Sequence, residues 1–427
     1  MKRNVFIAVL AVLLFVSNDA KAQSIVCGAE RTEVYLPFIE GKRIAVVANQ
    51  TSVIGNVHLV DSLLRLGVDV KKIFAPEHGF RGNVEAGGKV NSNKDDATGL
   101  NVVSLYGKKI KPSEEDLQDI DIVIFDIQDV GCRFFTYIST LHYVMEAVAQ
   151  NNKALIVLDR PNPNGFYIAG TLLSDTSLVS FVGLHPVPIV YGMTIGEYAK
   201  MINAEGWLGT SAKRVMGETS DMRCDLTIVP LLNYTHDSSY VPPIPPSPNL
   251  RTEAAIILYP SLCLFEGTPV SVGRGTDKPF EIIGFPNMKA DNKTIEFTPR
   301  AIKGISDNPP YRDEKCIGVL IDAFDWHYDA FRFYPILNQG HEYYNMENFR
   351  NRVVPNIIDA MYRIHPQTDK FFTPFFDKLA GTKDLQKVIT GELNYEDVKS
   401  KWAKELYDFG QMRKKYLLYA DFSANEQ

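Results

Sequence analysis

One stretch of the chain, residues 68–82, indicates both the fold and the position of a site, and it reads VDVKKIFAPEHGFRG. Its first half, Val68 to Phe74, is predicted to form a strand that ends in the apolar pair Ile73-Phe74. The strand leads into a loop that holds a carboxylate, an imidazole and a guanidinium: Glu77, His78 and Arg81. Polar loops on a rigid scaffold often carry function. The sequence therefore predicts a site at Glu77.

The same pattern recurs outward from this stretch. Strands are predicted at residues 43–48, 101–105, 120–127, 153–158 and 225–229, with helices at 58–66, 136–150 and 194–202. Strands that are nearly continuous in Val, Ile and Leu and alternate with helices predict a parallel sheet covered on both faces. The expected fold class is α/β, with a Rossmann-like, mostly parallel sheet and helices on both of its faces.

Four of the predicted strands run into polar loops, which begin at Asn49, Glu77, Asp126 and Asp159. Ligands of open parallel sheets bind beyond the carboxyl ends of the strands. Single polar loops with capping residues are common at such ends. The four loops together, on one edge of one sheet, favour a shared site.

The second part of the chain differs from the first. Residues 240–248 are rich in proline, so they form neither a helix nor a central strand and predict an extended connector across the cleft. A strand at 316–323 and helices at 346–364, at 383–390 and from 395 onward predict a smaller, helix-rich α+β C-terminal domain. A length of 427 residues suggests two domains. We expect a Rossmann-like domain at 23–252 and a second domain at 253–427 that completes the cleft.

The first 22 residues predict export. Lys2 and Arg3 precede the apolar run 5–16, and small residues follow up to Ala22, as in a secretory signal peptide. The apolar run is too short for a comfortable membrane span, and no later stretch is suited to one. A lipoprotein is the alternative because Cys27 is near, but no small residue directly precedes that cysteine. We expect a soluble protein that is exported to the periplasm, is cleaved near Ala22 and has no stable membrane insertion.

Composition and motifs argue against several classes of protein. A net charge of −6 gives no electrostatic reason to bind nucleic acid. The five cysteines are scattered, so neither a zinc site nor a disulfide framework is indicated, although one bridge between an unspecified pair is possible. The histidines lack metal-ligand spacing, and no nucleotide fingerprint or GxSxG elbow occurs. We expect no metal and no cofactor.

What remains is a set of carboxylates without a nucleophile or a cofactor. Glu77 is suited to general acid catalysis, or it is a structural carboxylate that pairs with Arg81 or Arg133. Arginines near these acids either bind an anionic substrate group or neutralise the acids. The candidates for a second carboxylate are Asp126, Asp129, Asp159, Glu266 and Glu281, and the further arginines are Arg160 and Arg274.

Several motifs, in one order, resemble a known family. They are APEHGFRG at 75–82, GCRFFTY at 131–137, LDRPNP at 158–163, PSPN at 246–249, LFEGT at 264–268 and GRGT at 273–276. Together they resemble the NamZ family of exo-β-N-acetylmuramidases, from about Arg43 to the YLLY close at 416–419. Two small departures are Pro269, where an Asn is common, and Asn164, where a Gly is usual. The resemblance implies a Rossmann-like catalytic domain, a smaller C-terminal domain and an active site in the crevice between them.

The resemblance also implies an activity. A glycoside hydrolase of this kind releases terminal N-acetylmuramic acid from the non-reducing end of peptidoglycan fragments, in cell-wall turnover and recycling. The family's proposed catalytic glutamate falls on Glu77, which we expect to protonate the leaving oxygen. A second acid, or the acetamido group of the substrate itself, would complete the reaction. The expected partners are peptidoglycan-derived muramyl sugars.

The resulting site prediction has two parts. The predicted catalytic residues are Glu77, Asp126 and Glu266. The predicted substrate-binding residues are Asn49, His78, Arg81, Arg133, Tyr137, Asp159, Asn162, Asn249 and Arg274. Two alternatives stay open at this point: a non-catalytic cell-wall sugar-binding protein on the same fold, and an amidase.

Overall fold

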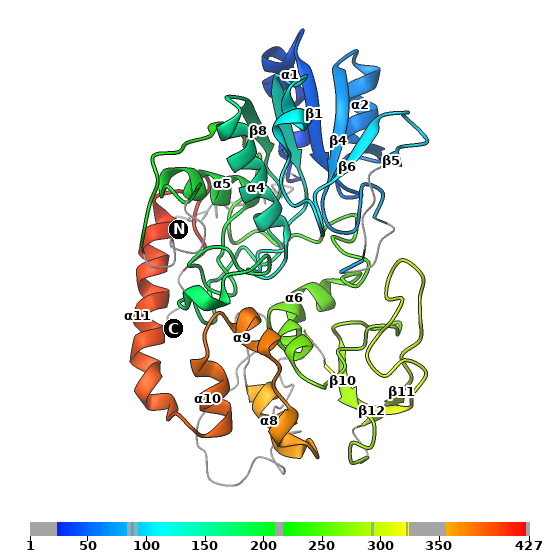
Figure 1. Ribbon diagram of the computed structural model, residues 1–427, viewed down its shortest axis with the longest axis vertical. Coiled ribbons are helices and arrows are strands. Elements are labelled where there is room, and N and C mark those ends of the chain that lie inside the picture. Colours follow the sequence, from blue (N-terminus) through cyan, green and yellow to red (C-terminus); the bar gives the residue numbers. More distant parts are fainter. Residues whose placement is uncertain are drawn as a thin grey trace, which may run out of the picture.

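The computed structural model describes residues 24–82, 87–88, 93–209, 217–291, 294–321, 323 and 356–423. The predicted signal peptide, and the first part of the helix predicted at 346–364, lie outside the described residues. In Figure 1 a sheet with flanking helices lies above a second, mostly helical unit. Within the described part of the chain, no helix has the length and apolar character to cross a membrane.

The main sheet has seven strands in the order β5-β6-β4-β1-β7-β8-β9. All neighbours pair in parallel except β5, which runs antiparallel to β6. If the six parallel strands are numbered along the chain, their spatial order is 3-2-1-4-5-6, which is the order of Rossmann sheets. The predicted fold class is confirmed. The strands are β1 (Arg43–Ala48), β4 (Asp69–Ala75), β5 (Asn93–Lys94), β6 (Asn101–Ser104), β7 (Ile122–Asp126), β8 (Ala154–Leu158) and β9 (Asp225–Val229).

Both faces of the sheet are covered, which explains why its strands β1, β7 and β8 read as nearly continuous apolar runs. Side chains of neighbouring residues point to opposite faces, so Phe74 and Phe125 enter one core while Ile73 and Ile124 enter the other. The first core is closed by α4 (Tyr137–Gln150) and α5 (Ile195–Ala204), and the second by α1 (Thr32–Ile39) and α2 (Leu59–Arg65). A short helix, α3 (Glu114–Leu117), precedes β7, and β2 (Val53–Ile54) pairs with β3 (Val57–His58) as a hairpin.

The second unit begins with α6 (Glu253–Leu262), which no prediction had placed. A small antiparallel sheet follows, in the order β10-β12-β11. Its strands are β10 (Ile282–Phe285), β11 (Ile295–Phe297) and β12 (Cys316–Leu320), and the later helices are α8 (Asn356–Ile364), α9 (Pro374–Ala380), α10 (Asp384–Thr390) and α11 (Tyr395–Lys414). The predicted helix at 383–390 and the one from 395 onward are confirmed, and the predicted strand at 316–323 is shorter than expected.

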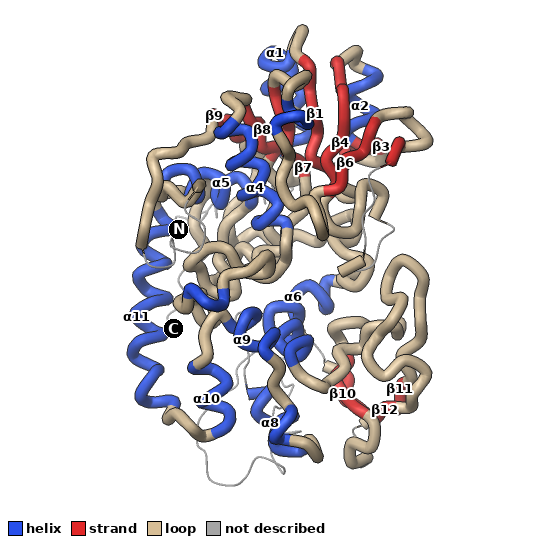
Figure 2. Tube along the Cα trace, viewed as in Figure 1, coloured by secondary structure: helices blue, strands red, loops and turns tan. Residues whose placement is uncertain are grey.

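The two units pack as one body. The core under α4 and α5 continues without interruption into residues of α6, α8, α9 and α11. Loops that follow the strands of the main sheet gather between that sheet and α6, as Figure 2 shows in tan. The predicted division at 252–253 falls at the start of α6. All five cysteines are buried and free, so none of them forms a disulfide.

Candidate active site

Glu77 lies two residues beyond the carboxyl end of β4, next to β1 at the centre of the sheet. The chain turns sharply after it, because the backbone N–H of Gly79 donates to the Pro76 carbonyl at 3.0 Å. His78 takes a φ of +69°, in the left-handed region that non-glycine residues rarely adopt. Unusual backbone of this kind gathers at functional sites. Both Glu77 and His78 are nearly buried, at 8% and 3% exposed.

The Glu77 carboxylate is held by hydrogen-bond donors. The Thr136 hydroxyl donates to Oε2 at 2.6 Å, and the Gly87 backbone N–H donates to Oε1 at 2.9 Å. The Tyr106 hydroxyl interacts with the same carboxylate. Among the described residues Glu77 makes no ion pair. The alternative in which it pairs with Arg81 or Arg133 is therefore wrong.

Arg81, which is the nearer of those two arginines to Glu77 in sequence, pairs with Asp95. Its guanidinium donates to both oxygens of Asp95, at 3.0 and 2.8 Å, and stacks over the Phe80 ring at 4.3 Å. The Arg81 hydrogen bond holds the pKa of Asp95 below its ordinary value. Because the Arg81 side chain is 36% exposed, part of its guanidinium still faces solvent.

Asn49 and Tyr137 meet at the end of β1. The Asn49 amide donates to the Tyr137 hydroxyl at 2.9 Å, and that hydroxyl donates to the Pro246 carbonyl at 3.0 Å. The Gln50 amide donates to Pro245 and Pro246 carbonyls at 3.1 and 3.3 Å. The proline-rich connector therefore lies against the carboxyl end of β1. Tyr137 directly follows Thr136, so this group adjoins the Glu77 carboxylate.

Asp126, at the end of β7, does not fit its predicted catalytic role. Arg160 binds both of its oxygens, at 2.6 and 2.9 Å, and donates to the Val53 carbonyl at 3.0 Å. Asp126 is 0% and Arg160 3% exposed. A buried carboxylate with its charge matched and both oxygens occupied is a structural ion pair. It joins the ends of β7 and β8.

Asp159 and Asn162 also have structural partners in place of the predicted substrate. Asp159 accepts hydrogen bonds from the Gly196 N–H at 2.8 Å, the Thr194 hydroxyl at 2.8 Å and the Tyr419 hydroxyl at 2.5 Å. It thereby fastens the start of α5 and the end of the chain to β8. Burial raises the pKa of Asp159 to about 7. The Asn162 amide donates to the Met193 carbonyl at 2.8 Å.

Arg133 and Asn249 are bonded to backbone carbonyls. The buried Arg133 guanidinium donates to the carbonyls of Thr171, Val187 and Leu379, at 2.6, 2.8 and 2.7 Å. Burial lowers the pKa of Arg133 to about 10. The Asn249 amide donates to the Ile305 carbonyl at 2.8 Å. Both side chains hold the two units together, and their predicted role in substrate binding does not fit this placement.

Glu266 and Arg274 form an ion pair in the second unit. Arg274 Nε donates to Glu266 Oε1 at 2.5 Å, and the guanidinium lies over the Phe280 ring at 4.9 Å. Their side chains stay 25% and 16% exposed. A row of edge-to-face rings connects this pair to the Glu77 site, through Tyr137, Phe135, Tyr259 and Phe280. Asp126 and Glu266 are the two carboxylates predicted to be catalytic besides Glu77, and of these Glu266 is the one in contact with solvent.

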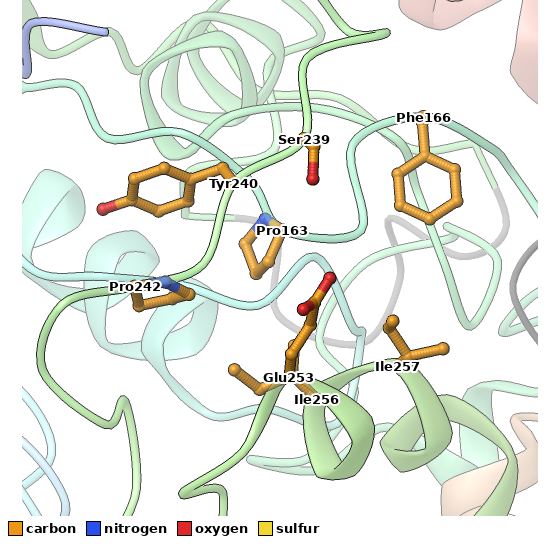
Figure 3. A pocket seen from close by; sticks show the side chains of 8 residues that line it. All are labelled: Pro163, Phe166, Ser239, Tyr240, Pro242, Glu253, Ile256 and Ile257. Atoms are coloured by element: carbon orange, nitrogen blue, oxygen red, sulfur yellow. The ribbon is translucent and has the colours of Figure 1, made fainter. Parts of the chain in front are cut away.

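A small pocket lies beside α6, where that helix faces the connector and the loop after β8 (Figure 3). The Glu253 carboxylate rises from α6 toward Pro163 and Ser239. The lining residues are Pro163, Phe166, Ser239, Tyr240, Pro242, Glu253, Ile256 and Ile257. They include none of the predicted site residues, so the pocket is separate from the Glu77 carboxylate.

Comparison with known proteins matches nearly the whole chain. Residues 44–254 match the N-terminal domain, and residues 257–419 the C-terminal domain, of exo-β-N-acetylmuramidase NamZ. The chain belongs to the NamZ family. It is 35% identical over 396 residues to the peptidoglycan β-N-acetylmuramidase NamZ of Bacillus subtilis (strain 168), an alignment that covers 90% of this chain and 89% of that protein. This NamZ family member is accordingly a glycoside hydrolase, and a non-catalytic role is not favoured.

Two solved structures of this family share the fold. One DUF1343 family protein of Bacteroides fragilis NCTC 9343 is 42% identical with a TM-score of 0.77, over 93% of this chain and 100% of its own. A second from the same organism is 29% identical with a TM-score of 0.74, over 92% of this chain and 99% of its own. The NamZ family fold is thus shared over almost the full length.

In this NamZ family member the structure brings Glu77, Asn49 and Tyr137 together and adds two residues that the sequence analysis did not select. Thr136 lies inside the motif at 131–137, but only its contact with Glu77 distinguishes it from its neighbours. Tyr106 is the first side chain after the strand predicted at 101–105. Like Glu77, it lies directly beyond the carboxyl end of a predicted parallel strand, where ligands of such sheets bind.

Proposed function

We propose that this glycoside hydrolase is an exo-acting β-N-acetylmuramidase that removes terminal N-acetylmuramic acid from the non-reducing end of peptidoglycan fragments. The observation that carries the proposal is the state of Glu77: a nearly buried carboxylate at the centre of the sheet edge, held by hydrogen-bond donors and without an ion pair among the residues that the structure describes. Such a group is available for proton transfer or for charge stabilisation in glycoside cleavage.

The relatives support the substrate and the mode of attack. The Bacillus subtilis relative is named for its action on peptidoglycan, and the matching family is described as exo-acting. We propose peptidoglycan-derived muramyl sugars as substrates and cell-wall turnover and recycling as the setting. The signal-peptide pattern in residues 1–22 supports export, and we place the activity in the periplasm.

Cleavage of a β-glycoside needs a proton for the leaving oxygen and a group that acts at the anomeric carbon. Asp126 is occupied by Arg160, which leaves Glu266 as the second predicted carboxylate. The second group can also come from the substrate, because the 2-acetamido oxygen of N-acetylmuramic acid is placed to attack its own anomeric carbon. Two routes therefore remain, and both use Glu77.

The test is an assay of the purified protein with a chromogenic β-N-acetylmuraminide and with soluble peptidoglycan glycans. We expect release of the chromophore and stepwise release of single N-acetylmuramic acid residues, detected by mass spectrometry. Glu77→Gln should lose about 10³-fold or more of the rate. Internal fragments would contradict exo action, loss of peptide in place of sugar would indicate an amidase, and undiminished release by Glu77→Gln would exclude Glu77.

A further inference from the structure

Thr136 departs from the usual chemistry of a helix start. It is the N-cap residue of α4, where a threonine side chain ordinarily accepts a hydrogen bond from the backbone of the first turn. The Thr136 side chain makes no capping bond. Its hydroxyl instead donates to Glu77 Oε2 at 2.6 Å, across 59 residues of sequence. A local rule that is broken in favour of one contact points to a functional reason for that contact.

Tyr106 reaches Glu77 through the register of the sheet. Ala75 of β4 lies opposite Ser104 of β6, and the Leu105 N–H donates to the Ala75 carbonyl at 2.8 Å. Glu77 and Tyr106 each lie two residues further on, so they leave the sheet side by side. The Tyr106 ring packs edge-on against Phe181, with 5.8 Å between ring centroids. Its contact with Glu77 is therefore set by backbone pairing and by packing.

The partners of Glu77 share one property: each can donate a hydrogen bond to it. The Gly87 N–H has no ability to accept one. Burial, with the charge of Glu77, raises the pKa of Tyr106 above its ordinary value, so the phenol stays protonated at neutral pH. Thr136 stands at the N-terminus of the 14-residue helix α4, where the helix dipole favours a negative charge. Donors of this kind stabilise the ionised form of a carboxyl group.

We propose that Thr136 and Tyr106 are positioning residues that hold the Glu77 carboxylate in one orientation. This rests on the proposed muramidase function. Held in this way, Glu77 acts on the anomeric side of the bond, where it orients the acetamido group, attacks the anomeric carbon or takes a proton from the attacking water. The C–O bond then breaks toward the leaving oxygen, which receives its proton from a second acid, and Glu266 is the remaining predicted carboxylate for that step. Water supplies the hydroxyl group that ends on the anomeric carbon. The assignment differs from the proton-donor role expected from the sequence.

The positioning role is tested with paired variants of α4. Thr136→Val removes the hydroxyl and keeps the shape, and Thr136→Ser restores the hydroxyl. Thr140 lies one turn further on in the same helix, and its hydroxyl donates to the Thr136 carbonyl at 3.4 Å, which makes Thr140→Val a matched control. We expect Thr136→Val to lower kcat about 10- to 100-fold with KM within twofold, because a shifted catalytic group loses rate of this order. Tyr106→Phe should act in the same direction.

Two outcomes would overturn the positioning role. One is an equal loss of kcat in Thr136→Val and Thr140→Val. The other is a Thr136→Ser variant that stays as slow as Thr136→Val although its thermal unfolding matches that of the wild type. Rescue by serine alone, with the control unaffected, supports the proposal.

The role of Glu77 is tested by changing the leaving group. The 4-nitrophenolate group of a 4-nitrophenyl β-N-acetylmuraminide leaves without being protonated. The N-acetylglucosamine leaving group of a disaccharide requires a proton. We expect Glu77→Gln to lose the same factor, within about threefold, on both substrates. A loss confined to the disaccharide would show that Glu77 is the proton donor and would overturn this inference while the muramidase function stands. No cleavage of either substrate by the wild type would instead remove the proposed function itself.

Discussion

The ends of β4 and β7 lie on the same edge of the sheet with β1 between them, and a predicted catalytic carboxylate stands at each of them. Asp126, the last residue of β7, is bound on both oxygens by Arg160 and is fully buried. Glu77 after β4 is bound by a hydroxyl and a backbone N–H and is left without a cation among the described residues. Position at a strand end therefore does not by itself make a carboxylate catalytic. The kind of partner it has separates the two roles.

The largest expected effect follows from replacing the uncompensated carboxylate. Glu77→Gln keeps the shape of the side chain but removes its charge. We expect the rate on a β-N-acetylmuraminide to fall about 10³-fold or more, while thermal unfolding shifts little. Rates under single-turnover conditions, with circular dichroism as the control for folding, provide the measurement. If Glu77→Gln lost its fold along with its activity, Glu77 would be a structural carboxylate like Asp126.

The opposite result is expected for Asp126→Asn. This change leaves the Arg160 guanidinium buried without its counter-charge, which costs about 3–5 kcal/mol of unfolding free energy. The activity of the molecules that remain folded should stay close to that of the wild type. Urea unfolding and a rate normalised to folded protein measure the two quantities. An Asp126→Asn variant that unfolds like the wild type but is inactive would return Asp126 to the catalytic site.

The same contrast explains how much of the molecule the sequence predicts. The strands β1, β7 and β8 are predicted because burial on both faces makes them nearly continuous apolar runs. In α6 eight of ten residues are buried, so that helix shows no amphipathic stripe, and Pro260 lies within it. Periodicity therefore gave no signal for α6.

The partners of the site carboxylates are harder to predict than the carboxylates themselves. Arg160 meets Asp126 because β8 lies beside β7, and Tyr106 meets Glu77 because β6 lies beside β4. Strand order and register arise from tertiary packing and leave no mark in a single sequence. The motif at 75–82 is enough to select Glu77. The sequence does not show that β8 lies beside β7, so it does not show that Arg160 pairs with Asp126.

A third carboxylate at a strand end, Asp159, makes the unfolding free energy of the protein depend on pH. Burial raises its pKa from 3.8 to about 7, the charge of Glu197 adds to the rise, and hydrogen bonds from Tyr419, Gly196 and Thr194 oppose it. Between pH 4 and 7 the unfolded chain loses this proton while the folded protein keeps it. The folded state is then the one with more bound protons, so this group makes the protein less stable as pH rises through that window.

The slope for one such group is at most about 1.4 kcal/mol per pH unit. Because other groups titrate too, the measured quantity is the difference in unfolding free energy between the wild type and Asp159→Asn, at pH 4.5, 5.5 and 6.5. We expect this difference to move against the wild type as pH rises. A difference that is independent of pH would mean that Asp159 is ionised in the fold and is closer to Asp126 in character than its surroundings indicate.

The smallest effect is expected at Arg81, the arginine that the sequence offered as a partner for Glu77. Its guanidinium pairs with Asp95 and is 36% exposed, so solvent screens the pair and Arg81→Met should cost less than about 1 kcal/mol. Because Glu77 does not depend on Arg81 for its charge balance, kcat should stay within about twofold of the wild type. KM separates a role in substrate binding from a purely structural role. If the guanidinium contacts an anionic substrate group, its removal raises KM. A fall in kcat as large as that of Glu77→Gln would show that Arg81 turns to Glu77 during the reaction, and the difference between the two loops would then hold only for the free protein.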